Sequence, residues 1–306
     1  MPTAPTDDPP GPPPPVAPKA GLRRAALMAC LGLDSIADRP DAIRDGAFTL
    51  LTPPQTGRPC PAVLYCHAHG GNHALGRQEL TAGARWLAAP PAPDLLAAGW
   101  AVLCIDMPGF GARSGLGSES ALAKAGLWQG RPLFGQMVAE QLAAARWLRS
   151  QPGIDARRIV TLGTSMGGAL ALWTAALDPD IAAAAHLCML ADIGPLIASG
   201  AHDRHGPYLT VPGLLRLAET GDIAALIAPR PQFVAHGALD PLTPPKARDA
   251  ALARLRAAYR DADRGVGLSL HLGPGTGHLE TPAMRRSLLD FLQALTVTDK
   301  HTRTAC

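Results

Sequence analysis

The chain has 306 residues, of which 47% are hydrophobic and 17% are charged, and its formal net charge is +3. The hydrophobic fraction is ample for a packed core and excludes a chain that is disordered throughout. Because the net charge is small and the basic residues are scattered, nucleic acid and anionic membrane surfaces are poor candidates for the main partner.

The N-terminal segment, residues 1–20, holds nine prolines. Proline fixes its own φ and donates no backbone hydrogen bond, so we expect an extended tail that is not part of the fold. Arg23 and Arg24 precede a short apolar stretch, but this stretch runs into Asp34 and predicts an amphipathic helix, not a secretory signal. Residues 21–300 are expected to form a single domain.

The cysteines and the hydropathy pattern bear on the cellular location of the protein. The six cysteines form no Cys-x-x-Cys pair and no spacing typical of a metal site, so a disulfide framework is not expected. No apolar run approaches the length that spans a bilayer. We therefore expect a cytoplasmic protein without a membrane span, and the sequence leaves its oligomeric state open.

Short apolar runs alternate along the chain with longer segments of helical periodicity. Several of the runs are apolar almost throughout, which is typical of strands covered on both faces in a parallel sheet. This alternation predicts a three-layer α/β fold, with a mostly parallel central sheet and helices on both faces. The predicted strands are Ala47–Leu51, Ala62–Cys66, Ala101–Ile105, Ile159–Leu162, Ala183–Leu190, Gln232–Ala235 and Leu268–Leu272. The main predicted helices are Phe134–Ser150, Gly167–Leu177, Lys246–Tyr259 and Ala283–Leu295.

The strongest chemical motif is Gly163-Thr-Ser165-Met-Gly167-Gly, which lies between a predicted strand and a predicted helix. A serine on such a sharp turn exposes its hydroxyl above the sheet edge, and the glycines let strand and helix approach closely. The helix N-terminus offers amide groups and positive potential to a developing oxyanion. Ser165 is therefore the predicted nucleophile; the alternative is a surface serine in a plain turn.

A serine nucleophile needs a base, and that base needs an acid. His278 lies in a glycine-rich loop after the last predicted strand, whereas His271 lies within that strand and is expected to be structural. Asp240 follows the preceding strand, which completes the order Ser, Asp, His. Asp203, in a predicted insertion, and Asp290, in a predicted helix, are the weaker candidates for the acid.

The loop His67-Ala-His69-Gly-Gly-Asn-His73 follows an early strand and can supply the second oxyanion donor. The predicted donors are the backbone amides of Met166 and His69. The three histidines also raise the alternative of a zinc site. We expect no metal and no cofactor, because no carboxylate or cysteine stands among these histidines in the sequence.

Taken together and in this order, these motifs resemble the α/β-hydrolase superfamily, within it the branch similar to dienelactone hydrolases and acetyl xylan esterases. The resemblance covers about residues 22–298 and includes the loop Asp106-Met-Pro-Gly-Phe-Gly111. It implies hydrolysis of esters through a covalent acyl-serine without a cofactor. Dienelactone hydrolase itself uses a cysteine nucleophile, whereas position 165 here is serine.

The segment 192–227 lies between two predicted strands and is expected to be a short, partly helical insertion that lines the substrate pocket. His205 and Tyr208 are candidate pocket residues, and core packing is the alternative for both. Trp128 and Met137 are expected to belong to the core.

Three functions follow from these expectations. The first is a serine-dependent carboxylic ester hydrolase acting on a small-molecule ester. The second is a peptidase of the prolyl-oligopeptidase type, which is disfavoured because the chain has no room for the large gating domain of those enzymes. The third is a catalytically silent hydrolase fold used for binding, against which the complete Ser, Asp, His set argues.

Overall fold

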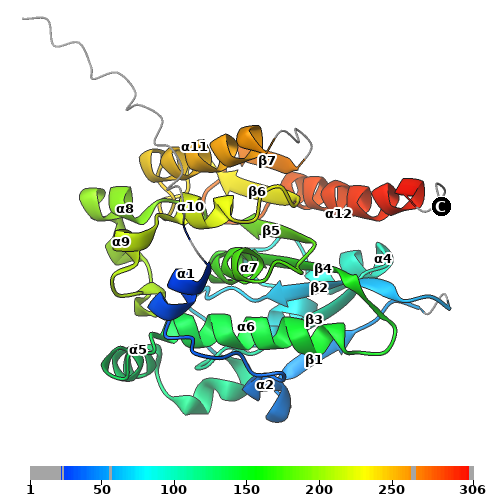
Figure 1. The fold of residues 1–306 in the computed structure, drawn as a ribbon, viewed down its shortest axis with the longest axis horizontal. Helices are drawn as coiled ribbons and strands as arrows, with labels where there is room; N and C mark the ends of the chain where they lie inside the picture. Colours follow the sequence, from blue (N-terminus) through cyan, green and yellow to red (C-terminus); the bar gives the residue numbers. More distant parts are fainter. Residues whose placement is uncertain (1–21, 23, 55–56, 263–266, 303–306) are drawn as a thin grey trace, which may run out of the picture.

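The computed structural model describes residue 22 and residues 24–54, 57–262 and 267–302 of the chain. A seven-stranded sheet runs through its centre (Figure 1), and its strand order is β1-β3-β2-β4-β5-β6-β7. β1 pairs antiparallel with β3, and every other neighbouring pair is parallel. The strands are β1 (Phe48–Leu51), β2 (Cys60–Cys66), β3 (Ala101–Ile105), β4 (Ile154–Thr164), β5 (Ala183–Leu187), β6 (Gln232–Gly237) and β7 (Leu268–Gly273). The predicted N-terminal tail, residues 1–20, lies outside the described residues.

The helices cover both faces of this sheet, as Figure 1 shows. The α-helices are α1 (Arg24–Cys30), α2 (Asp41–Arg44), α3 (Glu79–Ala82), α4 (Pro91–Ala97), α5 (Glu119–Trp128), α6 (Leu133–Arg149), α7 (Met166–Leu177), α8 (Ile193–Ser199), α9 (Leu214–Leu217), α10 (Thr220–Ala225), α11 (Pro245–Asp261) and α12 (Pro282–Thr302). The described residues also form short 3-10 helices: η1 (Gly76–Gln78), η2 (Gly111–Leu116), η3 (Ala201–Arg204) and η4 (Pro207–Leu209). The predicted three-layer α/β fold is confirmed.

The sheet is buried on both faces because its strands alternate between two hydrophobic clusters. In β2, Leu64 packs into the cluster formed with α6, α7 and α11. Its neighbours Val63 and Tyr65 pack into the opposite cluster, which contains residues of α4 and α12. All three side chains are at most 2% exposed. Burial on both faces explains why these strands are apolar almost throughout.

Two expectations about individual residues were wrong. The strand predicted over Ala183–Leu190 ends at Leu187, because Cys188 has a φ of 54° that breaks the extended conformation. Trp128, expected in the core, is 94% exposed at the end of α5. Met137 is fully buried as predicted.

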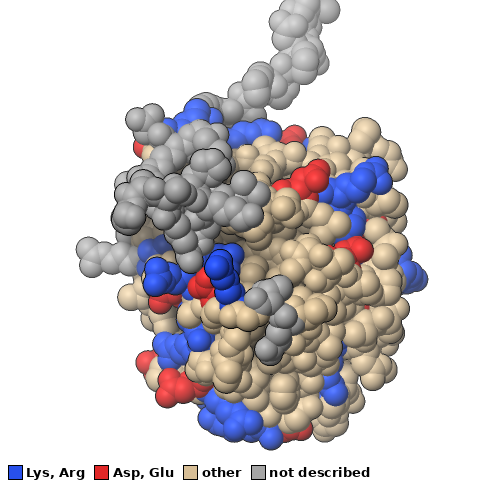
Figure 2. All heavy atoms as spheres, turned by 90° about the vertical axis from the view of Figure 1, so that its right-hand side faces the viewer, with Lys and Arg blue, Asp and Glu red and all other residues tan. Residues whose placement is uncertain are grey.

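Charged side chains form no single-sign patch on the face shown in Figure 2, where acidic and basic residues lie interspersed. Among the described residues, no helix is both long and apolar enough to cross a membrane.

Two buried histidines near the carboxyl ends of β5 and β6 predict sensitivity to acid. Burial lowers the pKa of His186 to about 4 and that of His236 to about 3. Neither ring nitrogen of His236 has a hydrogen-bond partner among the described residues. Both rings are therefore neutral in the folded protein at neutral pH, and protonation of either one opposes folding.

We expect the free energy of unfolding to be independent of these histidines above about pH 6.5, where a histidine in an unfolded chain is neutral. Below that pH the two imidazoles bind protons in the unfolded chain but not in the folded one. The free energy of unfolding should therefore fall by up to about 1.4 kcal/mol per pH unit for each ring. The measurement is urea unfolding between pH 7.5 and about pH 4.5. His236→Leu should lose less stability over this range than wild type, whereas His202→Leu, at an exposed position, should follow wild type. Equal losses in wild type and His236→Leu would contradict the explanation.

Candidate active site

Ser165 stands at the turn between β4 and α7, in a backbone conformation that few residues adopt. Its φ of 58° and ψ of −121° turn the chain sharply from strand to helix. The turn requires glycine on both sides. A Cβ on Gly163 would lie 2.3 Å from the backbone of Gly167, and a Cβ on Gly167 would lie 1.9 Å from the carbonyl oxygen of Cys66. The close packing of α7 on β2 and β4 thus explains the glycines of the motif.

The structure brings together the three residues predicted from separate motifs. His278 Nε2 lies 2.8 Å from Ser165 Oγ, and His278 Nδ1 lies 2.7 Å from Asp240 Oδ2. Because an ionised carboxylate only accepts, Nδ1 carries the proton and the lone pair of Nε2 faces the serine hydroxyl. This is the arrangement required for the imidazole to take the hydroxyl proton.

Asp240 is held as a buried carboxylate. It lies in the turn after β6, its side chain is 0% exposed, and its Oδ1 accepts the Leu242 amide at 2.8 Å. Burial by itself would raise the pKa of Asp240, but the hydrogen bonds from His278 and from the Leu242 amide outweigh it and lower the pKa below its ordinary value. The carboxylate is therefore ionised where it contacts the imidazole.

Two backbone amides stand near the serine as candidate oxyanion donors. Met166 is the first residue of α7, so its amide has no acceptor within the helix. In the loop after β2, the Ala68 amide donates to Glu79 and is occupied. The hydrogen bonds of the described residues include none donated by the His69 amide, and His69 lines the same cleft as Ser165. The geometry leaves Met166 and His69 as the candidates.

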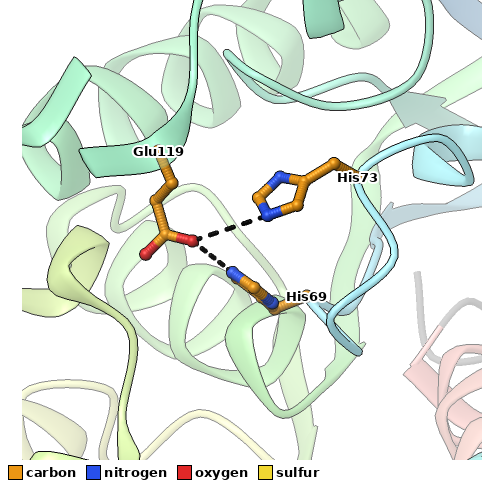
Figure 3. Close-up of side chains that lie close together, drawn as sticks. All are labelled: His69, His73 and Glu119. Carbon is orange, nitrogen blue, oxygen red and sulfur yellow. Dashed lines mark hydrogen bonds and ion pairs between the residues drawn. The ribbon is translucent and has the colours of Figure 1, made fainter. Parts of the chain in front are cut away.

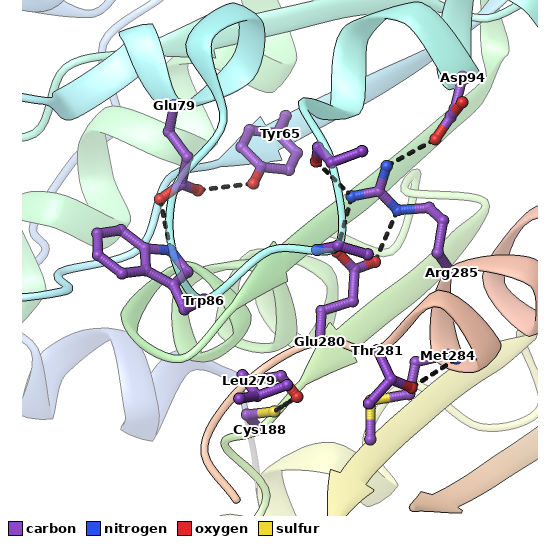
Figure 4. A network of polar contacts seen from close by, with 12 residues as sticks. Tyr65, Glu79, Trp86, Asp94, Cys188, Leu279, Glu280, Thr281, Met284 and Arg285 are labelled. Carbon is purple, nitrogen blue, oxygen red and sulfur yellow. Dashed lines mark hydrogen bonds and ion pairs between the residues drawn. The ribbon is translucent and has the colours of Figure 1, made fainter. Parts of the chain in front are cut away.

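Glu79, which the sequence did not indicate as a site residue, contacts Tyr65 and Trp86 beside the loop after β2 (Figure 4). Its fully buried carboxylate accepts from Tyr65 Oη at 2.6 Å, from Trp86 Nε1 at 2.9 Å and from the Ala68 amide at 3.1 Å. Burial raises the pKa of Glu79, and these hydrogen bonds oppose the rise. One carboxylate therefore ties the strand, the loop and the cleft wall together.

A second buried network supports the loop that carries His278 (Figure 4). Both oxygens of Glu280 accept from the guanidinium of Arg285, each at 2.7 Å. The same guanidinium donates to Asp94 at 2.7 Å, and the Glu280 amide donates to the Trp86 carbonyl at 2.9 Å. These contacts between α12, α4 and two loops lock the chain two residues after His278. No local pattern distinguishes Glu280 from a solvated residue, so the sequence did not indicate this role.

Two cavities adjoin Ser165 and His278. The inner one, of about 50 Å³, is lined mainly by apolar side chains, among them Phe134, Trp173 and Leu214. The outer one is an open cleft of about 710 Å³. His205 and Tyr208, the predicted pocket residues, line both cavities. Tyr208 is only 6% exposed, so its side chain also packs in the core. The predicted insertion contributes α8, η3, η4, α9 and α10, and supplies one wall of the inner cavity.

The other histidines and aspartates considered as candidates form no hydrogen bond with Ser165 or His278 in the described part of the structure. His67 is fully buried and accepts the Met107 amide at 3.1 Å, and His271 contacts Ser287 at 3.0 Å. Asp203 and Asp290 are exposed and lie outside both cavities.

The loop histidines have no carboxylate neighbour in the sequence, but they have one in the structure. A carboxylate does stand among the loop histidines in three dimensions, because Glu119 of α5 contacts His69 and His73. Partial burial would raise the pKa of Glu119, but the hydrogen bonds from His69 and from the Tyr208 amide lower it below its ordinary value.

Comparison with known proteins agrees with this fold. Residues 61–206 match the family model described as the alpha/beta hydrolase fold. The chain is 40% identical over 243 residues to the Bacillus subtilis (strain 168) protein named "Putative hydrolase YtaP". The matched region covers 79% of this chain and 80% of that protein. The chain belongs to the α/β-hydrolase family.

Solved α/β-hydrolase structures share the architecture at low sequence identity. A glucuronoyl esterase from Solibacter usitatus is 17% identical with a TM-score of 0.60, over 81% of this chain and 76% of that one. Acetyl xylan esterase 1 from Thermoanaerobacterium sp. JW/SL YS485 is 19% identical with a TM-score of 0.55, over 81% and 78% of the two chains. At such identities the likeness concerns the fold.

Proposed function

We propose that this α/β-hydrolase cleaves small carboxylic esters through an acyl-serine intermediate on Ser165. The observation that carries the proposal is the continuous hydrogen-bonded line from Asp240 through His278 to Ser165 Oγ. The esterases among the structural neighbours support the same reaction. The reaction needs no cofactor, because the nucleophile, the base and the acid all come from the chain.

In the first half of the reaction, Ser165 Oγ attacks the ester carbonyl carbon while His278 Nε2 takes the hydroxyl proton. The amides of Met166 and His69 stabilise the negative charge that develops on the carbonyl oxygen. The tetrahedral intermediate then expels the alcohol, which receives the proton from Nε2. In the second half, water attacks the acyl-serine by the same sequence, and the acid is released.

A fluorophosphonate probe tests the proposal, because it reacts with a serine only when a neighbouring base activates it. We expect native protein to be labelled stoichiometrically on the peptide that contains Ser165, as identified by mass spectrometry. An ester substrate added beforehand should slow the labelling. Absence of labelling in folded protein would support the catalytically silent alternative. Labelling with cleavage of prolyl peptide amides but no cleavage of esters would favour the peptidase.

The small inner cavity predicts a preference for short acyl groups. Apolar side chains of α6, α7 and the segment before β6 make up most of its lining, which suits an acyl chain of a few carbons. Across p-nitrophenyl esters from acetyl to decanoyl, kcat/KM should be highest for the short chains. Leu214, 5% exposed, closes one wall.

Leu214→Ala should shift the optimum by about two carbons and raise kcat/KM for that longer ester about tenfold, since each buried methylene contributes about 0.8 kcal/mol. Leu215→Ala is the matched control, because this neighbour is 39% exposed and does not line the inner cavity. An unchanged chain-length profile in Leu214→Ala would refute the assignment of the inner cavity to the acyl group.

A further inference from the structure

Beside the proposed catalytic residues, three potential metal-ligating side chains converge on one point (Figure 3). His69 and His73 come from the loop after β2, and Glu119 is the first residue of α5. One donor atom from each lies within 4.8 Å of the other two. Glu119 Oε2 is shared: it contacts His69 Nε2 and lies 3.9 Å from His73 Nε2.

The His73 ring is oriented with a lone pair toward this carboxylate. His73 Nδ1 lies 3.3 Å from the carbonyl oxygen of Gly109, which can only accept, so Nδ1 carries the proton. Phe110 stacks on the ring with centroids 4.6 Å apart and planes 25° apart, which holds its orientation. If the ring is neutral, Nε2 bears a lone pair, and this lone pair faces Glu119 Oε2, which is also an acceptor. Among the described residues, no donor lies between these two atoms. A cation between the two atoms satisfies both.

Glu119 is anchored so that one oxygen remains for this position. Its Oε1 accepts the Tyr208 amide at 3.1 Å, which leaves Oε2 toward the two imidazoles. A metal-ligating histidine ordinarily donates its other N–H to a carbonyl or a carboxylate, and His73 already does so. Two of the three ligands therefore have the surroundings of a metal site.

We propose that His69, His73 and Glu119 bind one divalent transition-metal ion. Zn²⁺ suits this set of two imidazole nitrogens and one carboxylate oxygen, which leaves at least one coordination position open. His69 must adjust, because its Nδ1 accepts the Gly71 amide at 3.0 Å and its Nε2 donates to Glu119. When the metal binds, the imidazole proton of His69 moves from Nε2 to Nδ1, and Nε2 coordinates the ion. The Gly71 amide, which is exposed, then donates its hydrogen bond to solvent instead of to Nδ1. The inference does not depend on the proposed ester hydrolysis.

A bound ion would join the loop that carries the His69 amide to α5 and to the segment that carries Tyr208. His69 also lines the cleft above Ser165, and its ring stacks on Tyr208 with centroids 5.5 Å apart. The ion would therefore stiffen the wall of the cleft.

The test is Zn²⁺ binding by full-length protein freed of metal by dialysis against a chelator, measured by competition with a chromophoric chelator. We expect one ion per chain, and a Co²⁺ absorption spectrum typical of low coordination number. His73→Ala and Glu119→Gln should each weaken binding at least about tenfold, since loss even of an outer-shell partner has that effect. His202→Ala controls for adventitious binding to an exposed histidine and should bind like wild type.

His73 lies outside both cavities, so metal-free His73→Ala should retain the fold and the metal-free activity of wild type. If His73→Ala does not fold, His73→Gln replaces it. Binding that is equally tight in wild type and the His73 variant would overturn the proposal. Failure of metal-free wild type to take up one Zn²⁺ per chain in competition with the chromophoric chelator would overturn it as well. Loss of ester hydrolysis with Zn²⁺ binding intact would bear only on the proposed function.

Discussion

Ser165→Ala should lower kcat for p-nitrophenyl esters by on the order of 10⁶, which is the effect of removing a serine nucleophile from an intact site. The hydroxyl oxygen lies 2.8 Å from His278 Nε2, and alanine leaves no oxygen there to attack the carbonyl carbon. The side chain takes no part in capping α7, so its loss should leave the helix intact.

The comparison requires folded protein, so thermal unfolding of the variant should match that of wild type within a few degrees. Ser199→Ala, in the segment that forms α8, is the matched control and should retain full activity. Activity that survives in Ser165→Ala, after purification away from contaminating esterases, would refute the acyl-serine mechanism.

Asp240→Asn should lower kcat by about 10⁴ with little change in KM. The substitution changes which nitrogen of His278 carries the proton, and it does not change the residues that bind the substrate. An asparagine can present its amide N–H to His278 Nδ1, which places the imidazole proton on Nε2. That nitrogen would then point a proton, in place of a lone pair, at Ser165 Oγ. The fold should persist, since the Leu242 amide keeps an acceptor in the asparagine carbonyl.

The matched controls are Asp203→Asn and Asp290→Asn, which remove the same charge at the two exposed positions that the sequence offered as weaker candidates. Both should retain nearly full activity. If either loses as much activity as Asp240→Asn, or if Asp240→Asn is as active as wild type, the assignment of the acid is wrong.

The predictable part of the fold rested on local patterns. β2, β3 and β6 are apolar runs because both of their faces are covered, and this pattern needs no knowledge of the partners. The end of β5 was not predictable in this way. Apolar residues continue to Leu190, but the backbone turns at Cys188, and hydrophobicity does not report a change of φ.

Trp128 illustrates the same limit for burial. A large apolar side chain near the start of a long helix favours the core, yet α5 ends at Trp128 and leaves the indole exposed. Which face of a short helix meets the rest of the molecule depends on where its neighbours pack, and no local pattern contains that information.

Ser165, His278 and Asp240 were accessible from the sequence because each stands in a segment whose local requirements are strict. The turn at Ser165 tolerates only glycine at positions 163 and 167, and the other two residues each follow a strand of one parallel sheet, whose carboxyl ends meet at one edge. The sequence by itself therefore determined the chemistry of the proposed site. Only the tertiary structure decided what surrounds it: the contacts of Glu79 and Glu280 with its loops, the size of the cavities, and the position of Glu119 beside His69 and His73. These contacts join segments far apart in the chain, and their geometry arises from packing, which no single segment specifies.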